Sequence, residues 1–369
     1  MNKHENFMKL ALELAEKGRG ATNPNPMVGA VLVKNGKIIG GAYHKRVGGL
    51  HAEALALKKA GKKAKGAAIY VNLEPCSHVG RTPPCADAII KSGVKKVYCA
   101  IKDPNRLNNG RGIKTLRNHG VSVSVGLLSG WAKELNEVFI KYITRGMPFV
   151  TLKSAQSLDG KIATRKHDSK WITSEPSRNY GHRLRSEVDA VLVGVNTIIK
   201  DNPILTSRRN RSPIKVVLDP YLRVPERANI FSKKSPSLAI VAILRDTLNK
   251  KEALEKVKRL TKKGVLVIGC RNKAGRIDLV RLLNELAELE IAHLLVEGGG
   301  DTAAGFIEAG LVDRALFFIA PKIIGGRNAL TSIEGLGAGK VKKAIKLRRV
   351  KVEAVGEDIL VKADVYGNS

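Results

Sequence analysis

The sequence has few cysteines, few aromatic side chains and no long apolar run. Its four cysteines in 369 residues are too few for a disulfide framework and suggest a reducing compartment. Aromatic residues make up only 4% of the chain, which leaves few rings on which single-stranded bases could stack. No run approaches the roughly 18 apolar residues of a membrane span. These shortages argue against a disulfide-rich secreted protein and against a membrane protein.

Acidic residues are also scarce, because 33 of them face 65 lysines and arginines and the formal net charge is +32. A strongly basic chain can bind nucleic acid through its phosphates. Here the basic residues are scattered along both halves, as in Lys62-Lys63 and Lys262-Lys263, rather than gathered in one arm. We therefore expect solvated faces and some attraction of phosphorylated small molecules, without a nucleic-acid partner.

The length suggests two domains, because a single core seldom grows to 369 residues. Residues 7–15 place apolar side chains at helical spacing among charged ones, which indicates a core helix rather than a signal peptide. A helix breaker at residues 144–148 gives a boundary between domains 1–145 and 148–366. A soluble cytoplasmic protein with no membrane partner is expected.

What the chain does contain is a spaced set of metal-binding residues. His51-Ala-Glu53 is followed by Pro75-Cys76 and Pro84-Cys85. Three protein ligands leave the fourth corner of a tetrahedral zinc ion for water, and the metal lowers the pKa of that water to about 7. Glu53 would then carry the proton from this water to the ring and to the departing amine. The pattern predicts hydrolytic deamination, with His51, Cys76 and Cys85 as zinc ligands and Glu53 as the catalytic residue.

The local sequence fits these roles. Side chains two apart on a helix diverge by about 200°, so His51 should stand at a helix start if it and Glu53 are to share a metal. Cys76 follows the apolar strand predicted over 68–73, and Cys85 opens the helix predicted over 86–91. A helix N-terminus favours the thiolate form of a cysteine.

Two other interpretations of this motif are open. A closed structural zinc site would recruit a fourth ligand, for which His44 or His78 is available, but such a site needs no glutamate beside a ligand. A Cys76–Cys85 disulfide would need an oxidising compartment.

The spacing of the two cysteines narrows the substrate. Deaminases that act on bases in nucleic acids usually carry Cys-x-x-Cys, whereas eight residues separate Cys76 from Cys85 in the string Pro75-Cys-Ser-His-Val-Gly-Arg-Thr-Pro-Pro-Cys85. With His-Ala-Glu, this string resembles the bacterial bifunctional deaminase-reductases of riboflavin biosynthesis. A tRNA or other nucleic-acid base deaminase with an accessory C-terminal domain is the alternative.

Strands and helices alternate through both halves, which predicts an α/β protein. One helical face before the boundary carries the recurring apolar residues Trp131, Leu135, Val138, Phe139 and Tyr142, which predicts a helix over 131–142. In the second half, Glu297-Gly-Gly-Gly-Asp301 ends a predicted strand and opens a predicted helix, where bare backbone amides can face a phosphate. The glycines do not form a dinucleotide fingerprint, so a tight turn is the competing interpretation.

The resemblance continues through 151–163, 169–173, 189–197, 201–206 and 320–325, and so covers nearly the whole chain. It implies a cytidine-deaminase-like α/β/α domain followed by a dihydrofolate-reductase-like α/β domain, with one Zn²⁺ in the first and NADPH in the second. The NADPH contacts implied by matching motifs are Ala155, Trp171, Thr197, Asp201, Gly299, Gly300, Asp301 and Gly305. The implied contacts to the phosphoribosyl substrate are Lys153, Ser169, Arg185, Leu205, Arg208 and Glu297.

For the deaminase half the resemblance implies substrate contacts from Asn25, His44, His78, Arg81, Asp103 and Asn105. Each implied residue also has a plain alternative: Trp171 as a core aromatic, Asp201 as a turn cap, the arginines as solvated side chains, and Asn25-Pro26 and Asp103-Pro104 as turns. One departure concerns the loop Asp103-Pro-Asn-Arg-Leu-Asn-Asn-Gly-Arg-Gly112, because the family often has proline after Asp-Pro-Asn and small residues before Gly-x-Gly.

The expected function is therefore deamination of 2,5-diamino-6-(5-phosphoribosylamino)pyrimidin-4(3H)-one to 5-amino-6-(5-phosphoribosylamino)uracil, followed by NADPH-dependent reduction of the ribosyl chain to ribityl. Lys153 or Glu297 would polarise or protonate the opened sugar, and the sequence does not choose between them. The resemblance also implies a homo-oligomer.

Overall fold

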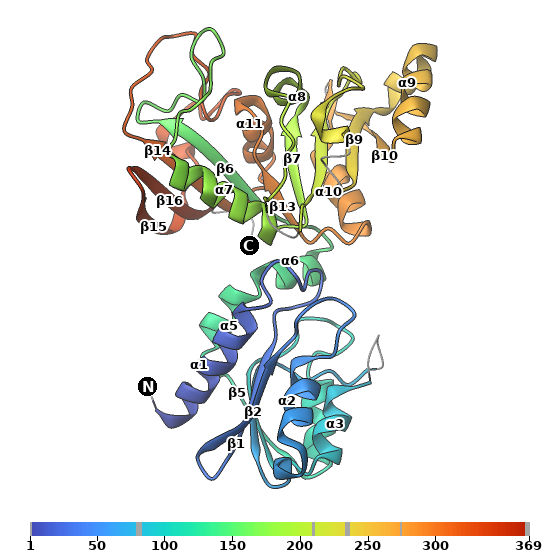
Figure 1. The fold of residues 1–369 in the computed structure, drawn as a ribbon, viewed down its shortest axis with the longest axis vertical. Coiled ribbons are helices and arrows are strands. Elements are labelled where there is room, and N and C mark those ends of the chain that lie inside the picture. Colours follow the sequence, from blue (N-terminus) through green and yellow to red (C-terminus); the bar gives the residue numbers. More distant parts are fainter. Residues whose placement is uncertain (1, 79–82, 209–210, 233–236, 274, 366–369) are drawn as a thin grey trace. The chain divides into compact units, whose positions relative to one another are not determined.

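The computed structural model describes residues 2–78, 83–208, 211–232, 237–273 and 275–365. It divides into two compact units, Met1–Met147 and Pro148–Ser369, which are considered separately (Figure 1). Both units are layered α/β structures, as the alternation of strands and helices predicted. Within the part of the chain that the structure describes, no helix has the length and apolar character needed to cross a bilayer.

The first unit is a five-stranded sheet with order β2-β1-β3-β4-β5, in which β1 is antiparallel to β2 and β3 while β3, β4 and β5 are parallel. The elements are α1 (Lys3–Glu16), β1 (Gly29–Lys34), β2 (Lys37–Tyr43), α2 (Ala52–Ala60), β3 (Ala68–Leu73), α3 (Cys85–Lys91), β4 (Lys96–Ile101), α4 (Arg111–Asn118), β5 (Ser122–Val125), α5 (Ser129–Leu135) and α6 (Glu137–Arg145).

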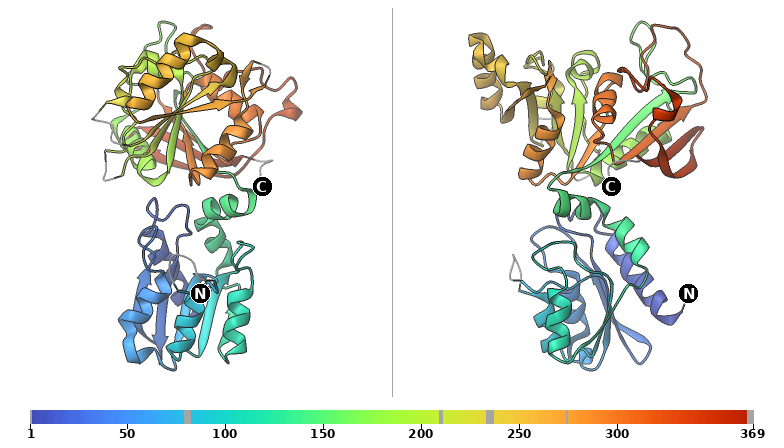
Figure 2. Two further views of the ribbon diagram at one scale, coloured as in Figure 1. Left: turned by 90° about the vertical axis from the view of Figure 1, so that its right-hand side faces the viewer. Right: turned by 180° about the vertical axis from the view of Figure 1, so that it is seen from behind.

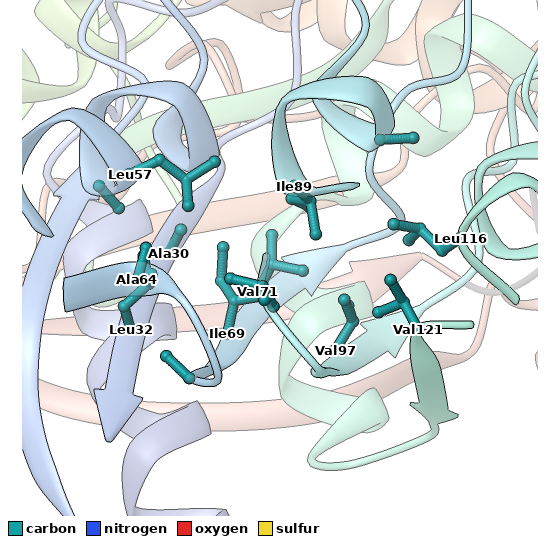
Figure 3. Packing of buried hydrophobic residues seen from close by; sticks show 14 of the residues in the cluster. Ala30, Leu32, Leu57, Ala64, Ile69, Val71, Ile89, Val97, Leu116 and Val121 are labelled. Carbon is teal, nitrogen blue, oxygen red and sulfur yellow. The ribbon is translucent and has the colours of Figure 1, made fainter. Parts of the chain in front are cut away.

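Alternating side chains of the strands build a core on each face of this sheet. Ile69 and Val71 of β3 pack under α2, α3 and α4, where they meet Leu57, Ile89 and Leu116 (Figure 3). Tyr70, on the opposite face, packs with α1 and α5. Successive residues of a strand point to opposite faces, so both sides of β3 must be covered. The segment 7–15 is therefore a core helix, as predicted.

The helix predicted over 131–142 is in fact two helices, α5 and α6, separated at Asn136. The buried Asn136 side chain accepts a hydrogen bond from Met27 N at 2.8 Å and donates one to Met27 O at 3.0 Å. An asparagine side chain that forms hydrogen bonds with distant backbone can interrupt a helix. The periodicity of the apolar residues gives no sign of such an interruption.

The second unit is a nine-stranded sheet with order β10-β9-β8-β7-β13-β6-β14-β16-β15. The strands from β10 to β14 are parallel, and β16 and β15 add antiparallel partners at one edge. The elements are β6 (Phe149–Ser157), α7 (Glu175–Glu187), β7 (Ala190–Gly194), α8 (Val195–Asp201), β8 (Ile214–Leu218), β9 (Ala239–Leu244), α9 (Lys251–Lys262), β10 (Val265–Cys270), α10 (Leu279–Glu288), β13 (His293–Val296), α11 (Gly300–Glu308), β14 (Arg314–Ala320), β15 (Leu347–Val355) and β16 (Asp358–Val365), with a small hairpin of β11 (Asn272–Lys273) and β12 (Arg276–Ile277).

Helices cover both faces of this sheet (Figure 2). Leu282 and Leu286 of α10 and Phe306 of α11 join one core, whereas Ile198 of α8 and Leu260 of α9 join the other. In a parallel α/β sheet, ligands bind beyond the carboxyl ends of the strands. We therefore expect a ligand site at the segments that follow β6, β7 and β13.

Candidate active sites

Three chain segments converge on the predicted metal site of the first unit. His51 is the N-cap of α2 with extended backbone angles (φ −69°, ψ 159°), so it stands at a helix start as the sequence predicted. Cys76 lies three residues beyond the end of β3, and Cys85 is the first residue of α3. The histidine and the two cysteines therefore meet although the first and the last lie 34 positions apart in the sequence.

The geometry of the three ligand atoms fits zinc. They lie within 4.8 Å of one another, with His51 Nδ1 at 3.2 Å from Cys85 Sγ and 3.5 Å from Cys76 Sγ. Zinc bonds of about 2.3 Å to sulfur and about 2.0 Å to nitrogen give ligand separations of about 3.5 to 3.8 Å in a tetrahedron. The Cys85 amide donates to Cys76 Sγ at 3.3 Å, and hydrogen bonds from Cys85 and His51 lower the pKa of the Cys76 thiol to about 4. The set can therefore hold a metal ion with a thiolate ligand.

Glu53 is placed to work beside this cluster. Its carboxyl is 3% exposed, and its Oε2 has no hydrogen-bond partner among the described residues. Burial raises the pKa of Glu53 to about 7, against the opposing effect of His51. The carboxyl interacts electrostatically with His51, Cys76 and Cys85. A buried carboxylate oxygen without a partner is costly, so this atom indicates a missing polar group in the pocket.

His44 lies next to the cluster but is engaged elsewhere. Its ring meets that of His51 edge-on, with centroids 5.5 Å apart. Its Nε2 lies 3.3 Å from Asn25 Nδ2 and its Nδ1 lies 3.2 Å from Leu50 O. Burial lowers the pKa of His44 and so favours the neutral ring. Because both ring nitrogens have other partners, the closed structural zinc site with His44 as fourth ligand is disfavoured. Asn25 and His44 lie beside the cluster, and their contact with a substrate stays a prediction.

The other predicted contacts of this unit lie on two loops. Asp103 is buried, and its Oδ1 accepts a hydrogen bond from Asn105 N at 2.9 Å, while Asn105 Oδ1 accepts one from Leu107 N at 3.0 Å. Both residues thus form local turns, and a substrate contact would come from the loop that these turns hold in place. His78 is exposed at the end of a described segment, and Arg81 lies outside the described residues.

Sequence reasoning missed two buried polar residues at this site. Glu74 accepts hydrogen bonds from the backbone amides of Asp103, Gly110 and Ile113 at 2.9 to 3.1 Å. Asn108 is fully buried and bonds to Ser77 and Asp103. The only signal for Glu74 was its position directly before Pro75-Cys76, and an asparagine in a polar loop reads as a turn residue.

In the second unit, an ion pair lies directly beyond the end of β13, beside the part of β6 that carries Lys153. Arg185 of α7 binds Glu297 through Nε at 2.9 Å and Nη2 at 2.6 Å, and its Nη1 donates to Thr206 O at 3.3 Å. Burial opposes the charged forms, but the ion pair raises the pKa of Arg185, and Arg185 with Lys153 holds the pKa of Glu297 below its usual value. Burial lowers the pKa of Lys153. The structure therefore brings three predicted substrate residues together from three elements.

The glycine-rich segment after β13 closely approaches the end of the neighbouring β7. A Cβ on Gly298 would lie 2.7 Å from Gly194 N, and one on Gly300 would lie 2.4 Å from Thr331 O. By contrast, no atom of the described residues would lie within 4 Å of a Cβ on Gly299, the N-cap of α11. Gly298 and Gly300 are thus required by packing, and Gly299 leaves open backbone beside the start of a helix. This arrangement fits the phosphates of a dinucleotide.

The remaining predicted cofactor residues lie on β6, in the segments that follow β6 and β7, and on α11. Ala155 is near the end of β6, which neighbours β13, and Thr197 and Asp201 lie on α8 directly after β7. Trp171 is 63% exposed and stacks against Arg178 at 4.6 Å, so the alternative of a core aromatic is wrong. Asp301 is exposed in the first turn of α11, and Gly305 lies farther along that helix.

Three predicted substrate residues differ in what they can offer. The Leu205 side chain is buried in the core, so only its backbone can reach a ligand. Arg208 is exposed, and its segment adjoins α7 because His182 and Arg185 both bond Thr206 O. Ser169 is partly exposed in the loop that follows β6 and carries Trp171.

Comparison with known proteins agrees with this division of sites. Residues 1–101 match the family model of the cytidine and deoxycytidylate deaminase zinc-binding region, and residues 148–361 match that of the RibD C-terminal domain. The two units are therefore a zinc-dependent deaminase and a reductase in one chain.

Full-length relatives share both units. Riboflavin biosynthesis protein RibD of Aquifex aeolicus is 50% identical over 361 residues, covering 97% of each chain, and that of Escherichia coli is 38% identical over 96% of this chain and 97% of its own. The structure of Acinetobacter baumannii RibD matches with TM-score 0.89 at 33% identity over 99% of both chains. A Thermotoga maritima diaminohydroxyphosphoribosylaminopyrimidine deaminase/5-amino-6-(5-phosphoribosylamino)uracil reductase matches with TM-score 0.85 at 38% identity, over 98% of this chain and 99% of that one.

The chain belongs to the RibD family and is a bifunctional deaminase and reductase of riboflavin biosynthesis. The predicted fold class is confirmed, and so are Zn²⁺ for the deaminase unit and NADPH for the reductase unit. The nucleic-acid base deaminase is not favoured, because the relatives match across the second unit as well as the first.

Metal content tests the ligand assignment. Wild-type protein should contain one zinc per chain, and Cys76→Ser should lose most of it, because a serine hydroxyl is a much poorer zinc ligand than a thiolate. Elemental analysis of purified protein measures both. Cys270→Ala, which removes a buried thiol of the other unit, is the control and should keep its zinc. Full zinc in Cys76→Ser would reject Cys76 as a ligand.

Proposed function

We propose that the first unit deaminates 2,5-diamino-6-(5-phosphoribosylamino)pyrimidin-4(3H)-one and that the second reduces the ribosyl chain of the resulting 5-amino-6-(5-phosphoribosylamino)uracil. The observation that carries the proposal is the His51, Cys76 and Cys85 cluster beside Glu53 Oε2, which has no hydrogen-bond partner in the described part of the chain. The same chain carries a glycine-rich segment at the reductase site. The name of the Thermotoga maritima relative joins the same two activities. Deaminase activity is assigned to residues 1–145 and reductase activity to 148–366.

The deaminase step replaces the ring amine by the oxygen of water and releases ammonia. Zinc, when bound by the cluster, activates the water. Glu53 Oε2 accepts one proton from the attacking water and delivers it to the ring nitrogen as the C–O bond forms. It then takes the remaining proton of the water-derived hydroxyl and delivers it to the amine, which leaves as ammonia when the C–N bond breaks. Asn25 and His44 hold the pyrimidine, with Asp103, Asn105, His78 and Arg81 contributed by the two loops.

Substitution of the proton carrier separates the two activities. Glu53→Gln should lower the rate of ammonia release by about 10²-fold or more, because the amide keeps the shape but cannot carry the proton. Zinc content and NADPH oxidation with the uracil intermediate should remain at wild-type levels. Asp87→Asn, on an exposed face of α3, is the control. Full deaminase turnover in Glu53→Gln would contradict the role of Glu53.

In the reductase unit the Arg185–Glu297 ion pair indicates which charged residue acts on the sugar. NADPH, when bound along Ala155, Trp171, Thr197, Asp201 and the segment from Gly299 to Gly305, supplies the hydride. Both oxygens of Glu297 are taken by Arg185, so Glu297 is held as a carboxylate and is a poor proton donor. We therefore assign to Lys153 the role of protonating the sugar or donating a hydrogen bond to it. The Lys153 amine lies 5.7 Å from the Phe318 ring centre.

The same ion pair bears on phosphate recognition. Because the Arg185 fork already binds Glu297 and Thr206 O, the exposed Arg208 is the better candidate for the substrate phosphate. Leu205 contributes backbone, and Ser169 contributes a hydroxyl from the loop of Trp171. Asp301 suits a ribose hydroxyl rather than a phosphate, since a carboxylate and a phosphate both carry negative charge.

Removal of the Lys153 amine tests its assignment against Glu297. Lys153→Met should lower the kcat of NADPH oxidation with the uracil substrate by about 10²-fold, the usual size of a lost acid-base group. Binding of NADPH, followed by its fluorescence, should change little. Lys262→Met, at the exposed end of α9, is the matched control. A reductase that tolerates Lys153→Met but not Glu297→Gln would reverse the assignment.

A cytoplasmic location suits the site, because Cys76 and Cys85 bind zinc as thiolates and a disulfide between them would destroy it. The edge strand β15 supports the proposed homo-oligomer. All residues from Leu347 to Ala354 are exposed, and Val350 and Val352 are 54% and 65% exposed. An open edge with apolar side chains invites pairing, and we propose that a second copy of this chain covers it.

A charge on this strand should disrupt the oligomer. Val352→Glu should lower the mass measured by light scattering after gel filtration to that of one chain, because the interface would have to bury a carboxylate in place of an apolar side chain. Leu254→Glu places the same charge on an exposed apolar position of α9 and should leave the mass unchanged. A wild-type mass equal to one chain would exclude the homo-oligomer.

A further inference from the structure

The side chain of Asn108 joins the loop of Cys76 to the loop of Asp103. Its Oδ1 accepts hydrogen bonds from Ser77 N at 2.9 Å and Ser77 Oγ at 2.8 Å. Its Nδ2 donates to Asp103 Oδ2 at 3.2 Å and, less closely, to Pro75 O at 3.4 Å. The two residues that flank the metal-binding Cys76 are therefore both bonded to one amide, which is also bonded to a residue of the proposed substrate loop.

Chemistry fixes the orientation of this amide. The Ser77 backbone can only donate from its N–H, and the Pro75 carbonyl can only accept. The amide oxygen must therefore face Ser77 and the amide nitrogen must face Pro75 and Asp103. Asn108 is 0% exposed, so water cannot replace any of these bonds without opening the site. An apolar side chain of similar size would leave a buried amide and a buried carboxylate oxygen without these partners.

The loop around Asn108 is also anchored by hydrogen bonds to the buried side chain of Glu74. Glu74, 3% exposed, accepts from the amides of Asp103, Gly110 and Ile113 and so anchors both ends of the loop. A Cβ on Gly112 would lie only 2.0 Å from Pro75 O, which shows how closely the loop and the Cys76 segment approach. With its ends fixed by Glu74, the middle of the loop is tied to the Cys76 segment through Asn108.

We propose that Asn108 is a positioning residue of the deaminase site. It holds the Cys76 ligand and the Asp103 carboxylate in a fixed position relative to each other. Its Oδ1 serves the metal side by fixing Ser77, and its Nδ2 serves the substrate side by fixing Asp103 Oδ2. The substrate half of this inference rests on the proposed contact of Asp103 with the pyrimidine, whereas the metal half requires only the ligand cluster.

Two substitutions at this position separate the halves. Asn108→Asp keeps an acceptor for the two short bonds from Ser77 and gives up only the longer bond to Pro75 O on the metal side, while it turns a second carboxylate oxygen toward Asp103. It should leave zinc release unchanged and raise the KM for the diaminopyrimidine phosphate about tenfold, with little change in kcat. Asn108→Ala removes both contacts, so it should raise KM similarly and also speed zinc release to a chromogenic chelator by about tenfold.

Asn109→Ala is the matched control, because its side chain is exposed in the same loop. It should change neither quantity. NADPH oxidation with the uracil substrate, measured on each variant, should stay at the wild-type level and shows that the chain has folded. A merely structural role would lower the amount of active enzyme and hence kcat, but it would not separate KM from zinc release between the two variants.

Wild-type KM and wild-type zinc release in Asn108→Ala would overturn the inference, as would equal zinc loss in both variants. A fall in kcat at unchanged KM would also overturn it. Should wild-type enzyme release no ammonia from the diaminopyrimidine phosphate, the proposed function fails. The zinc-release comparison would still decide the metal half of the inference.

Discussion

The deaminase unit depends on a buried carboxylate oxygen that has no partner among the described residues. Burying Glu53 beside two cysteines and a histidine costs free energy unless a metal and its water complete the pocket. The fold meets this constraint by bringing the start of α2, the segment after β3 and the start of α3 to one point. Both faces of β3 are covered by helices, so the position of the ligands is fixed by the core beneath them.

The reductase unit handles buried charge differently. Glu297 and Arg185 form a two-point ion pair, and Lys153 lies near enough to help hold the pKa of Glu297 down. The charges of this cluster neutralise one another without a ligand. The backbone at Gly299, by contrast, is left open for a ligand. Preformed charges can orient a substrate without large rearrangement, which is what hydride transfer between two bound molecules requires.

The sequence was most informative where a functional residue stands beside a clear local signal for a strand or a helix. His51, Cys76 and Cys85 could be predicted because each lies at the end of a strand or helix with a clear local signal, and the structure places all three as expected. The Arg185–Glu297 pair could not be predicted, because its members lie 112 positions apart in the sequence and only the fold brings them together. Asn136 and Asn108 were missed for one reason: a buried asparagine bonded to distant backbone looks like a turn former in the sequence.

The buried charges of the first unit need a bound metal, whereas those of the second unit neutralise each other, and this difference affects how the two activities depend on zinc. Loss of zinc leaves Glu53 and a thiolate uncompensated in the first unit, so the stability of that unit is linked to metal binding. In the second unit Arg185 and Glu297 neutralise each other, so this pair does not depend on a bound ion. Each unit also has its own sheet and its own cores on both faces. Metal removal therefore acts on deamination first, and the reductase can persist without it.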